Sequence, residues 1–214
     1  MKCDCNKDHE FIINRILYYK RKENQTILCT KCNPINKHQS GLELQVLNFI
    51  KNNYDDEIII NNRNIISPCE LDIYIPKLKI AFEFNGLYWH NELNKNNNYH
   101  FDKTQKCNNL NINLFHIFED DWLYKQEIVK SMILNKLNKT INKIYARNCV
   151  IKEINDNYII KNFLNDNHLQ GFVVSTTKIG LFYNNELISL MTFKKKYNDF
   201  ELNRFCNKKN TIVI

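Results

Sequence analysis

Asp72 and Glu83 stand in neighbouring segments, 70–75 and 78–84, in which apolar and polar residues alternate. Such alternation is typical of β-strands, and Pro76-Lys77 between the segments predicts a turn. If this hairpin pairs in register, Asp72 and Glu83 lie on the same face of adjacent strands. Two carboxylates this close repel one another unless a cation lies between them, and such oxygens with water hold Mg²⁺ near phosphates. The pattern predicts either a magnesium site or two solvent-exposed carboxylates on a hairpin.

Two histidines and a lysine follow the hairpin closely. The segment 86–90 ends in His90, and the segment 98–110 reads as a helix capped by Asn98. Helical spacing places His100 and Lys103 one turn apart on one face, before a largely apolar strand predicted over 112–118. A single histidine is usually a structural hydrogen-bonding group. Together, however, these side chains could activate water, protonate a leaving oxygen and stabilise a pentacoordinate phosphate.

A further acidic residue lies in the first turn of the helix predicted before the hairpin. Ser40 as N-cap and Glu43 three residues later form a capping box, and apolar residues then recur at helical spacing up to Ile50. The capping box is a sufficient structural reason for Glu43, so a catalytic role needs separate support. A strand is predicted over 57–60, followed by a turn at Asn61-Asn62.

Four of the eight cysteines form two close pairs, Cys3-x-Cys5 and Cys29-x-x-Cys32. Four thiolates from two such pairs are typical of a structural tetrahedral Zn²⁺ site, which can hold together a short segment that has no large core. His9 or His38 could replace one member of the first pair. A redox C-x-x-C is disfavoured because no βαβ pattern surrounds it. The other four cysteines are expected to be small core residues.

The charge of the chain is unevenly distributed. The formal net charge of +7 divides into +4 over residues 1–40, −5 over 41–122 and +8 over 123–214. A lysine-rich codon bias would spread the positive charge evenly, so it does not explain an acidic centre between basic flanks. A polyanion-binding protein that gathers carboxylates around metal ions has this distribution. Without a membrane-spanning run or a signal peptide, we expect a soluble intracellular protein.

The C-terminal third is predicted to be a helix followed by a small α+β region. A basic amphipathic helix is expected over 123–139, with a polar connector over 138–143. Another helix is expected over 158–165, then a hairpin of 179–183 and 187–193 around an Asn184-Asn185 turn, and a strand near 200–205. The final run, 211–214, reads as a strand that stops midway. The lysines of this C-terminal region (Lys194–Lys196, Lys208 and Lys209) are candidates for binding DNA.

The order of these features resembles the very-short-patch-repair endonucleases. It resembles more closely the EDxHD homing-type endonucleases, a branch of the PD-(D/E)XK nuclease superfamily. The similarity is strongest over 70–122, in ELDIYIP, AFEFNGLYWH, YHFDKT and FEDDW, and extends back through the cysteine pairs. It implies an α/β (α+β) fold whose mixed central sheet is flanked by helices, as in restriction endonucleases.

The resemblance also implies roles for individual residues. Asp72 matches the essential metal-binding aspartate, Glu43 the glutamate of the preceding helix, and His90 the histidine of the Gly-x-x-Trp-His segment. Asn85 stands where the wider superfamily has the lysine of E-x-K, so Lys103 or His100 is expected to supply the missing positive charge. The final aspartate of the family falls near 100–102.

The sequence therefore predicts an Mg²⁺-dependent endonuclease of double-stranded DNA, homing-endonuclease-like. We expect a zinc-binding module over 1–39, the nuclease domain over 40–140 and an incomplete accessory α+β domain over 150–214. The alternative is a catalytically silent zinc-containing DNA-binding protein on a nuclease scaffold. The accessory region also resembles half of an N-acetyltransferase sheet, but it has no Gly-rich loop for a pyrophosphate, which disfavours acyl transfer.

Overall fold

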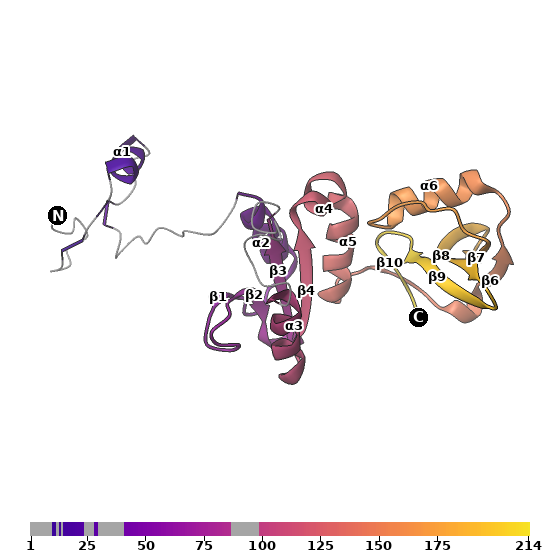
Figure 1. The fold of residues 1–214 in the computed structure, drawn as a ribbon, viewed down its shortest axis with the longest axis horizontal. Helices are drawn as coiled ribbons and strands as arrows, with labels where there is room; N and C mark the ends of the chain where they lie inside the picture. The colour runs from indigo at the N-terminus through magenta and orange to yellow at the C-terminus, as the bar shows by residue number, and fades with distance from the viewer. Residues whose placement is uncertain (1–9, 12, 14, 24–27, 30–40, 87–98) are drawn as a thin grey trace. The chain divides into compact units, whose positions relative to one another are not determined.

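The computed structural model of the 214-residue chain describes residues 10, 11, 13, 15–23, 28, 29, 41–86 and 99–214. The chain divides into two compact units, residues 1–41 and residues 42–214. The described part of the first unit contains the helix α1 (Arg15–Glu23). The second unit contains three separate sheets together with helices, so this part of the chain is mixed α/β (Figure 1).

The first sheet has the strand order β1-β2-β3-β4. Its strands are β1 (Ile59–Asn62), β2 (Leu71–Ile75), β3 (Ile80–Asn85) and β4 (Asn113–Phe118). The pairs β1–β2 and β2–β3 are antiparallel, whereas β3–β4 is parallel. A parallel pair needs a crossover connection, and the connecting segment includes α3 (Tyr99–Asn109). The prediction of a mixed central sheet is confirmed.

The register of β2 and β3 decides which side chains share a face. Ile73 pairs with Phe82 and Ile75 with Ile80, so continuing the ladder by one residue puts Asp72 opposite Glu83. The connection is a turn of 3₁₀ helix, Pro76–Leu78, closed by Lys79 in the left-handed region at φ 52°. The sequence predicted β3 from residue 78. It begins two residues later because the proline-initiated turn takes up residues 76–79.

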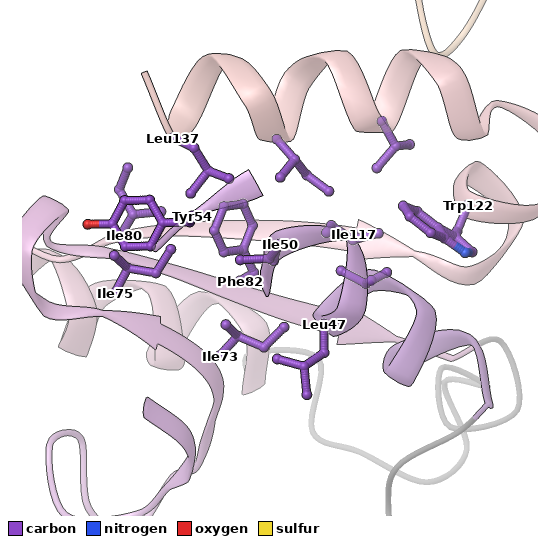
Figure 2. Packing of buried hydrophobic residues seen from close by; sticks show 13 residues of the cluster. Leu47, Ile50, Tyr54, Ile73, Ile75, Ile80, Phe82, Ile117, Trp122 and Leu137 are labelled. Carbon is purple, nitrogen blue, oxygen red and sulfur yellow. The ribbon is translucent and has the colours of Figure 1, made fainter. Parts of the chain in front are cut away.

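Both faces of this sheet are covered. On one face, α2 (Gly41–Asn53) and α5 (Gln126–Lys136) bury the main core against the strands (Figure 2). The strands contribute Ile73, Ile75, Ile80, Phe82 and Ile117, and the helices Val46, Leu47, Ile50, Val129 and Ile133. A second cluster joins Cys107 of α3 to Ala81 of β3. The helix α3 therefore packs on the face that carries the polar residues.

Two sequence predictions in this unit are wrong in detail. The strand β1 extends through Asn61 and Asn62 instead of ending before them, because the Asn62 side chain begins the turn by accepting the N–H groups of Asn64 and Ile65 at 3.0 Å. The single helix expected over 123–139 is two helices, α4 (Glu119–Tyr124) and α5. Lys125 between them leaves the helical region at φ −131°, which separates the helices.

The C-terminal sheet has the order β6-β7-β8-β9 and is antiparallel throughout. Its strands are β6 (Val150–Glu153), β7 (Thr177–Tyr183), β8 (Glu186–Lys196) and β9 (Asp199–Asn207). The helix α6 (Asn157–Asn167) packs Ile160 and Leu164 on Leu187 and Leu190. Asn184 and Asn185 both have positive φ, which confirms the predicted hairpin turn.

A small third sheet pairs β10 (Thr211–Val213) with β5 (Asn142–Ile144) in parallel. The final apolar run is therefore a paired strand, and part of the predicted polar connector is its partner. The described helices include none that is long and apolar enough to cross a membrane.

Candidate functional site

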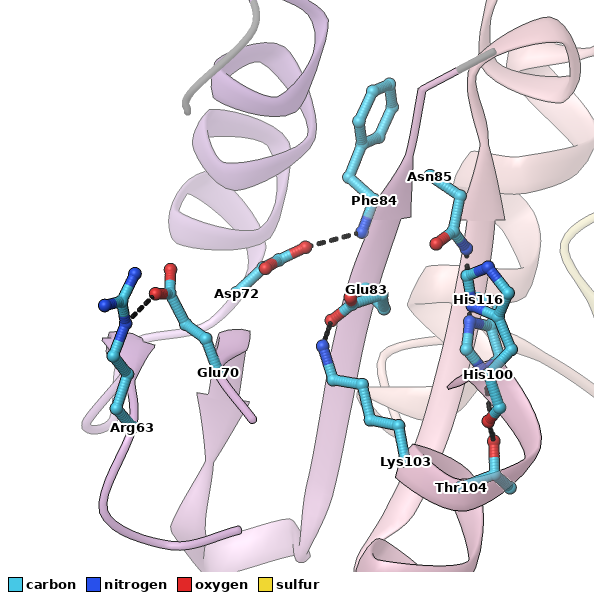
Figure 3. Close-up of polar contacts among 10 residues, drawn as sticks. All are labelled: Arg63, Glu70, Asp72, Glu83, Phe84, Asn85, His100, Lys103, Thr104 and His116. Atoms are coloured by element: carbon cyan, nitrogen blue, oxygen red, sulfur yellow. Dashed lines mark hydrogen bonds and ion pairs between the residues drawn. The ribbon is translucent and has the colours of Figure 1, made fainter. Parts of the chain in front are cut away.

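Asp72 and Glu83 lie on the face of the first sheet that α3 covers. The ladder of β2 and β3 sets them opposite one another, and Glu83 is close enough to affect the pKa of Asp72. Asp72 Oδ2 also accepts the backbone N–H of Phe84 at 2.9 Å (Figure 3). This bond fixes one oxygen of Asp72 against the neighbouring strand. The two predicted metal-ligand side chains therefore converge, as the alternation of the sequence requires.

Lys103 enters the same cluster from α3. Its Nζ forms an ion pair with Glu83 Oε2, and the two residues are 1% and 7% exposed. A lysine this deeply buried needs such a partner, because an unpaired charge away from water is costly. The ammonium group beside Glu83 therefore comes from α3 and not from the strand β3.

The electrostatics of Asp72 reflect this setting. Burial raises the pKa of Asp72 above its ordinary value, because the charged form loses water. The nearby charge of Lys103 and the N–H of Phe84 offset part of this rise. The charge of Glu70, which is paired with Arg63 at 2.5 Å, adds to it. The net effect is that the charged form of Asp72 is less stable than that of an exposed carboxyl group.

A polar chain continues from this cluster along the same face. The parallel register sets His116 of β4 beside Glu83. Asn85 Nδ2 lies 3.1 Å from His116 Nδ1, and Thr104 Oγ1 lies 3.2 Å from His116 Nε2. Thr104 also donates its hydroxyl hydrogen to the carbonyl of His100 at 2.7 Å, and the rings of His100 and His116 are edge to face, 5.6 Å apart.

Sequence reasoning missed His116 and Thr104. The available signal was a histidine inside an otherwise apolar strand, at a position that alternation places opposite to Phe115 and Ile117. That signal was too weak to act on, since isolated polar residues in strands are common at sheet edges. Only the parallel register of β3 and β4 shows that His116 lies beside Glu83.

Other predicted site residues are placed separately. Glu43 lies in the first turn of α2 and is buried, and its catalytic role stays a prediction. Ser40, its predicted capping partner, and His90 lie outside the described residues. Of the four predicted zinc ligands, Cys29 is described and is buried, whereas Cys3, Cys5 and Cys32 lie outside the described residues. Arg21 of α1 donates to the carbonyl of Cys29 at 3.2 Å.

The donor set at Asp72 and Glu83 suits a divalent cation in its chemistry. Both ligands are carboxylates, which Mg²⁺ prefers, and sites for this ion commonly use one or two carboxylates completed by water and substrate phosphate. In the residues that the structure describes, no group of three or more His, Cys, Asp or Glu side chains has metal-binding geometry.

No protein-family model, curated protein or solved structure matches this chain.

Proposed function

We propose that this protein is a metal-dependent endonuclease of double-stranded DNA with a restriction-endonuclease-like fold and an N-terminal zinc module. The observation that supports this most directly is the convergence of Asp72 and Glu83 on one sheet face, with Lys103 of α3 paired to Glu83. Carboxylates, a lysine and histidines on one surface are the groups that phosphodiester hydrolysis requires.

The proposed reaction gives each residue of the site a separate role. Asp72 and Glu83 would hold Mg²⁺ at the scissile phosphate, and Lys103 keeps Glu83 oriented and balances part of the negative charge. Bound Mg²⁺ would supply polarisation of the phosphoryl group and easier deprotonation of the attacking water. His100 and His90 are the candidates for moving protons, and Glu43 for orienting the site. The basic flanks bind the DNA backbone, so affinity should fall steeply with salt.

The test is cleavage of supercoiled plasmid by the full chain, with Mg²⁺ and with EDTA. We expect nicked or linear product only with Mg²⁺ and none from Asp72→Asn. Asp56→Asn is the matched control, because Asp56 is an exposed carboxylate of the same unit, paired with Lys77. Equal activity of the parent and Asp72→Asn would contradict the assignment. Sequencing the ends from a mixed DNA pool then reports strand geometry and specificity.

The zinc module has a separate test. Zinc content of the purified full chain is measured by elemental mass spectrometry, and one zinc per chain is expected. Cys32→Ala should lose it, whereas Cys149→Ala, which changes a cysteine outside the predicted site, should keep it. Retention of zinc by Cys32→Ala would exclude the predicted ligand set.

The second candidate is a catalytically silent DNA-binding protein on the same scaffold. One observation favours it: the charge of Glu83 is already balanced by Lys103, so this carboxylate does not need a cation to be stable. Calorimetric titration with Mg²⁺ separates the two candidates. DNA binding without Mg²⁺ binding or cleavage supports the silent protein, and Mg²⁺ binding that is lost in Asp72→Asn supports the enzyme.

A further inference from the structure

His116 joins the sheet to α3 at the point where Lys103 enters the cluster. It lies on the edge strand β4 of the first sheet, in register with Glu83 of β3. Asn85 and Thr104, which lie within hydrogen-bond distance of its ring nitrogens, come from segments already in the site: Asn85 follows Glu83 by two residues, and Thr104 follows Lys103 directly (Figure 3). One imidazole ring therefore connects β3, β4 and α3.

The groups near the two ring nitrogens favour one tautomer of His116. The Thr104 hydroxyl has one hydrogen, which it donates to the carbonyl of His100. At His116 Nε2 the Thr104 oxygen must therefore accept, so Nε2 carries a hydrogen. With the Asn85 amide oriented so that Nδ2 faces the ring, Nδ1 accepts and carries none. His116 is then a neutral imidazole with its hydrogen on Nε2.

This arrangement fixes the rotation of α3 about its own axis. A bond at Thr104 sets the direction of the adjacent Lys103 side chain, because neighbouring residues of a helix point about 100° apart. The stem of Lys103 is long and flexible, and ordering it costs conformational entropy. A helix held at residue 104 limits where the ammonium group can go, which favours its contact with Glu83.

We propose that His116 is a positioning residue that acts through Thr104 to hold the Lys103 ammonium at Glu83. It need not touch substrate or metal. The geometric part of this inference is independent of the reaction, and its effect on cleavage rests on the proposed nuclease function. The neutral ring supplies one donor to Thr104 and one acceptor to Asn85, and the donor is the group that matters for Lys103.

Paired variants separate the two hydrogen bonds. His116→Gln places an amide near the position of Nε2 and keeps the link to Thr104, whereas His116→Asn places one near Nδ1 and keeps only the link to Asn85. His116→Phe keeps a planar ring and loses both. Thr104→Ser keeps the hydroxyl, and Thr104→Val keeps the shape without it. We expect His116→Gln and Thr104→Ser to behave like the parent. His116→Asn, His116→Phe and Thr104→Val should all lose the position of Lys103.

The position of Lys103 can be read without any activity assay. The folded full chain is treated briefly with an amine-acetylating reagent, and acetylation of each lysine is measured by peptide mass spectrometry. Lys103 should be protected in the parent, His116→Gln and Thr104→Ser, and its labelling should rise at least about fivefold in the other three variants. Lys77, an exposed lysine, is the internal reference, and unchanged labelling of the remaining lysines shows that each variant is folded.

Two further readouts complete the test. Long-range ¹H–¹⁵N NMR of histidine-labelled protein should show His116 with Nε2 protonated and Nδ1 bare. If the parent cleaves DNA, the three disrupting variants should lose about 10- to 100-fold in kcat with little change in KM, whereas the two conservative variants stay within about threefold.

Equal Lys103 labelling in all five variants, or an Nδ1–H tautomer, would overturn the inference. A parent that does not cleave refutes the nuclease function alone, because labelling still decides the role of His116.

Discussion

Lys103 and Glu83 form a buried ion pair between a helix and an inner strand of the first sheet. Glu83 lies near the end of β3, and Lys103 lies in the second turn of α3. Together with Asp72 it makes a cluster of two carboxylates and one ammonium group. Such a cluster retains a negative charge that a cation can neutralise.

Breaking this ion pair on one side should be strongly destabilising. We expect Lys103→Met to lower the free energy of unfolding by about 3 to 5 kcal/mol, because Glu83 is left as a buried charge without its ammonium partner. The double variant Lys103→Met/Glu83→Gln should recover much of the loss. The control is Lys77→Met, which removes an exposed partner of Asp56 and should cost at most about 1 kcal/mol. Urea unfolding measures all three, and a double variant that is no more stable than Lys103→Met would contradict the pairing.

Asp72→Asn should stabilise the protein in the absence of divalent ions. Burial disfavours the charged form of Asp72, and an asparagine oxygen can still accept the N–H of Phe84. We expect a gain of about 1 kcal/mol near neutral pH in EDTA. Millimolar Mg²⁺ should raise the melting temperature of the parent and leave that of the variant unchanged. A variant less stable than the parent in EDTA would show that Asp72 is structurally required.

Gly180 of β7 should not tolerate a larger side chain. A Cβ placed there would lie 2.5 Å from Ile154, 2.8 Å from Leu187 and 2.9 Å from Phe182, all side-chain atoms of the C-terminal core. Gly180→Ala should therefore cost about 1 to 3 kcal/mol. Gly41→Ala is the control, because nothing lies within 4 Å of its added Cβ and alanine favours a helix. Thermal unfolding compares the two, and equal effects would contradict the tight packing at Gly180.

Acidification should destabilise the C-terminal part through His168. Burial, and next the charge of Arg204, lowers the pKa of His168 below 6.5. Its Nδ1 accepts the N–H of Gln170 at 3.1 Å, which requires the unprotonated atom. The unfolded chain therefore takes up a proton that the folded chain does not, so stability is lost as the pH falls below 6.5 and towards the lowered folded pKa.

The His168→Asn variant removes this titration, and its side-chain oxygen can replace Nδ1 as acceptor. We expect the variant to lose less stability than the parent between about pH 7.5 and about pH 5.5. Urea unfolding at several pH values measures the difference. Parallel pH profiles for the two proteins would show that His168 is not held in its neutral form.

Two cysteines should resist alkylation in the folded chain. Burial raises the pKa of Cys206 to about 12 and also raises the pKa of Cys107, so neither forms the reactive thiolate near neutral pH. Iodoacetamide at about pH 8 should modify both slowly in the native protein and rapidly in urea. Peptide mapping would report this, with Cys149 as the reference. Labelling of Cys206 as fast as Cys149 would contradict its burial.

The local parts of the fold were predictable because they depend on neighbouring residues. Alternation in 70–85 was enough to place Asp72 and Glu83 on one face, and the two asparagines at 184 and 185 were enough to define a hairpin. The break at Lys125 was not predictable, since the helical pattern of the sequence continues through it.

The polar chain around the candidate site depended on long-range pairing. His116 lies beside Glu83 because β4 pairs in parallel with β3, and nothing in the sequence near either residue fixes that register. The sequence named Lys103 only as one of two candidates, with His100, for the positive charge near Glu83. The structure pairs Lys103 with Glu83, a contact between a helix and a strand that the sequence near either residue does not define.

The parallel pairing of β5 with β10 brings the two ends of the C-terminal part together. Ile214 donates to the carbonyl of Ile144 at 2.9 Å, and Ala146 donates to the carbonyl of Ile214 at 2.7 Å. The segment 145–210 therefore begins and ends beside the same pair of strands. Replacing this segment by recombination at its two ends would leave intact the strands and the helix that carry Asp72, Glu83 and Lys103.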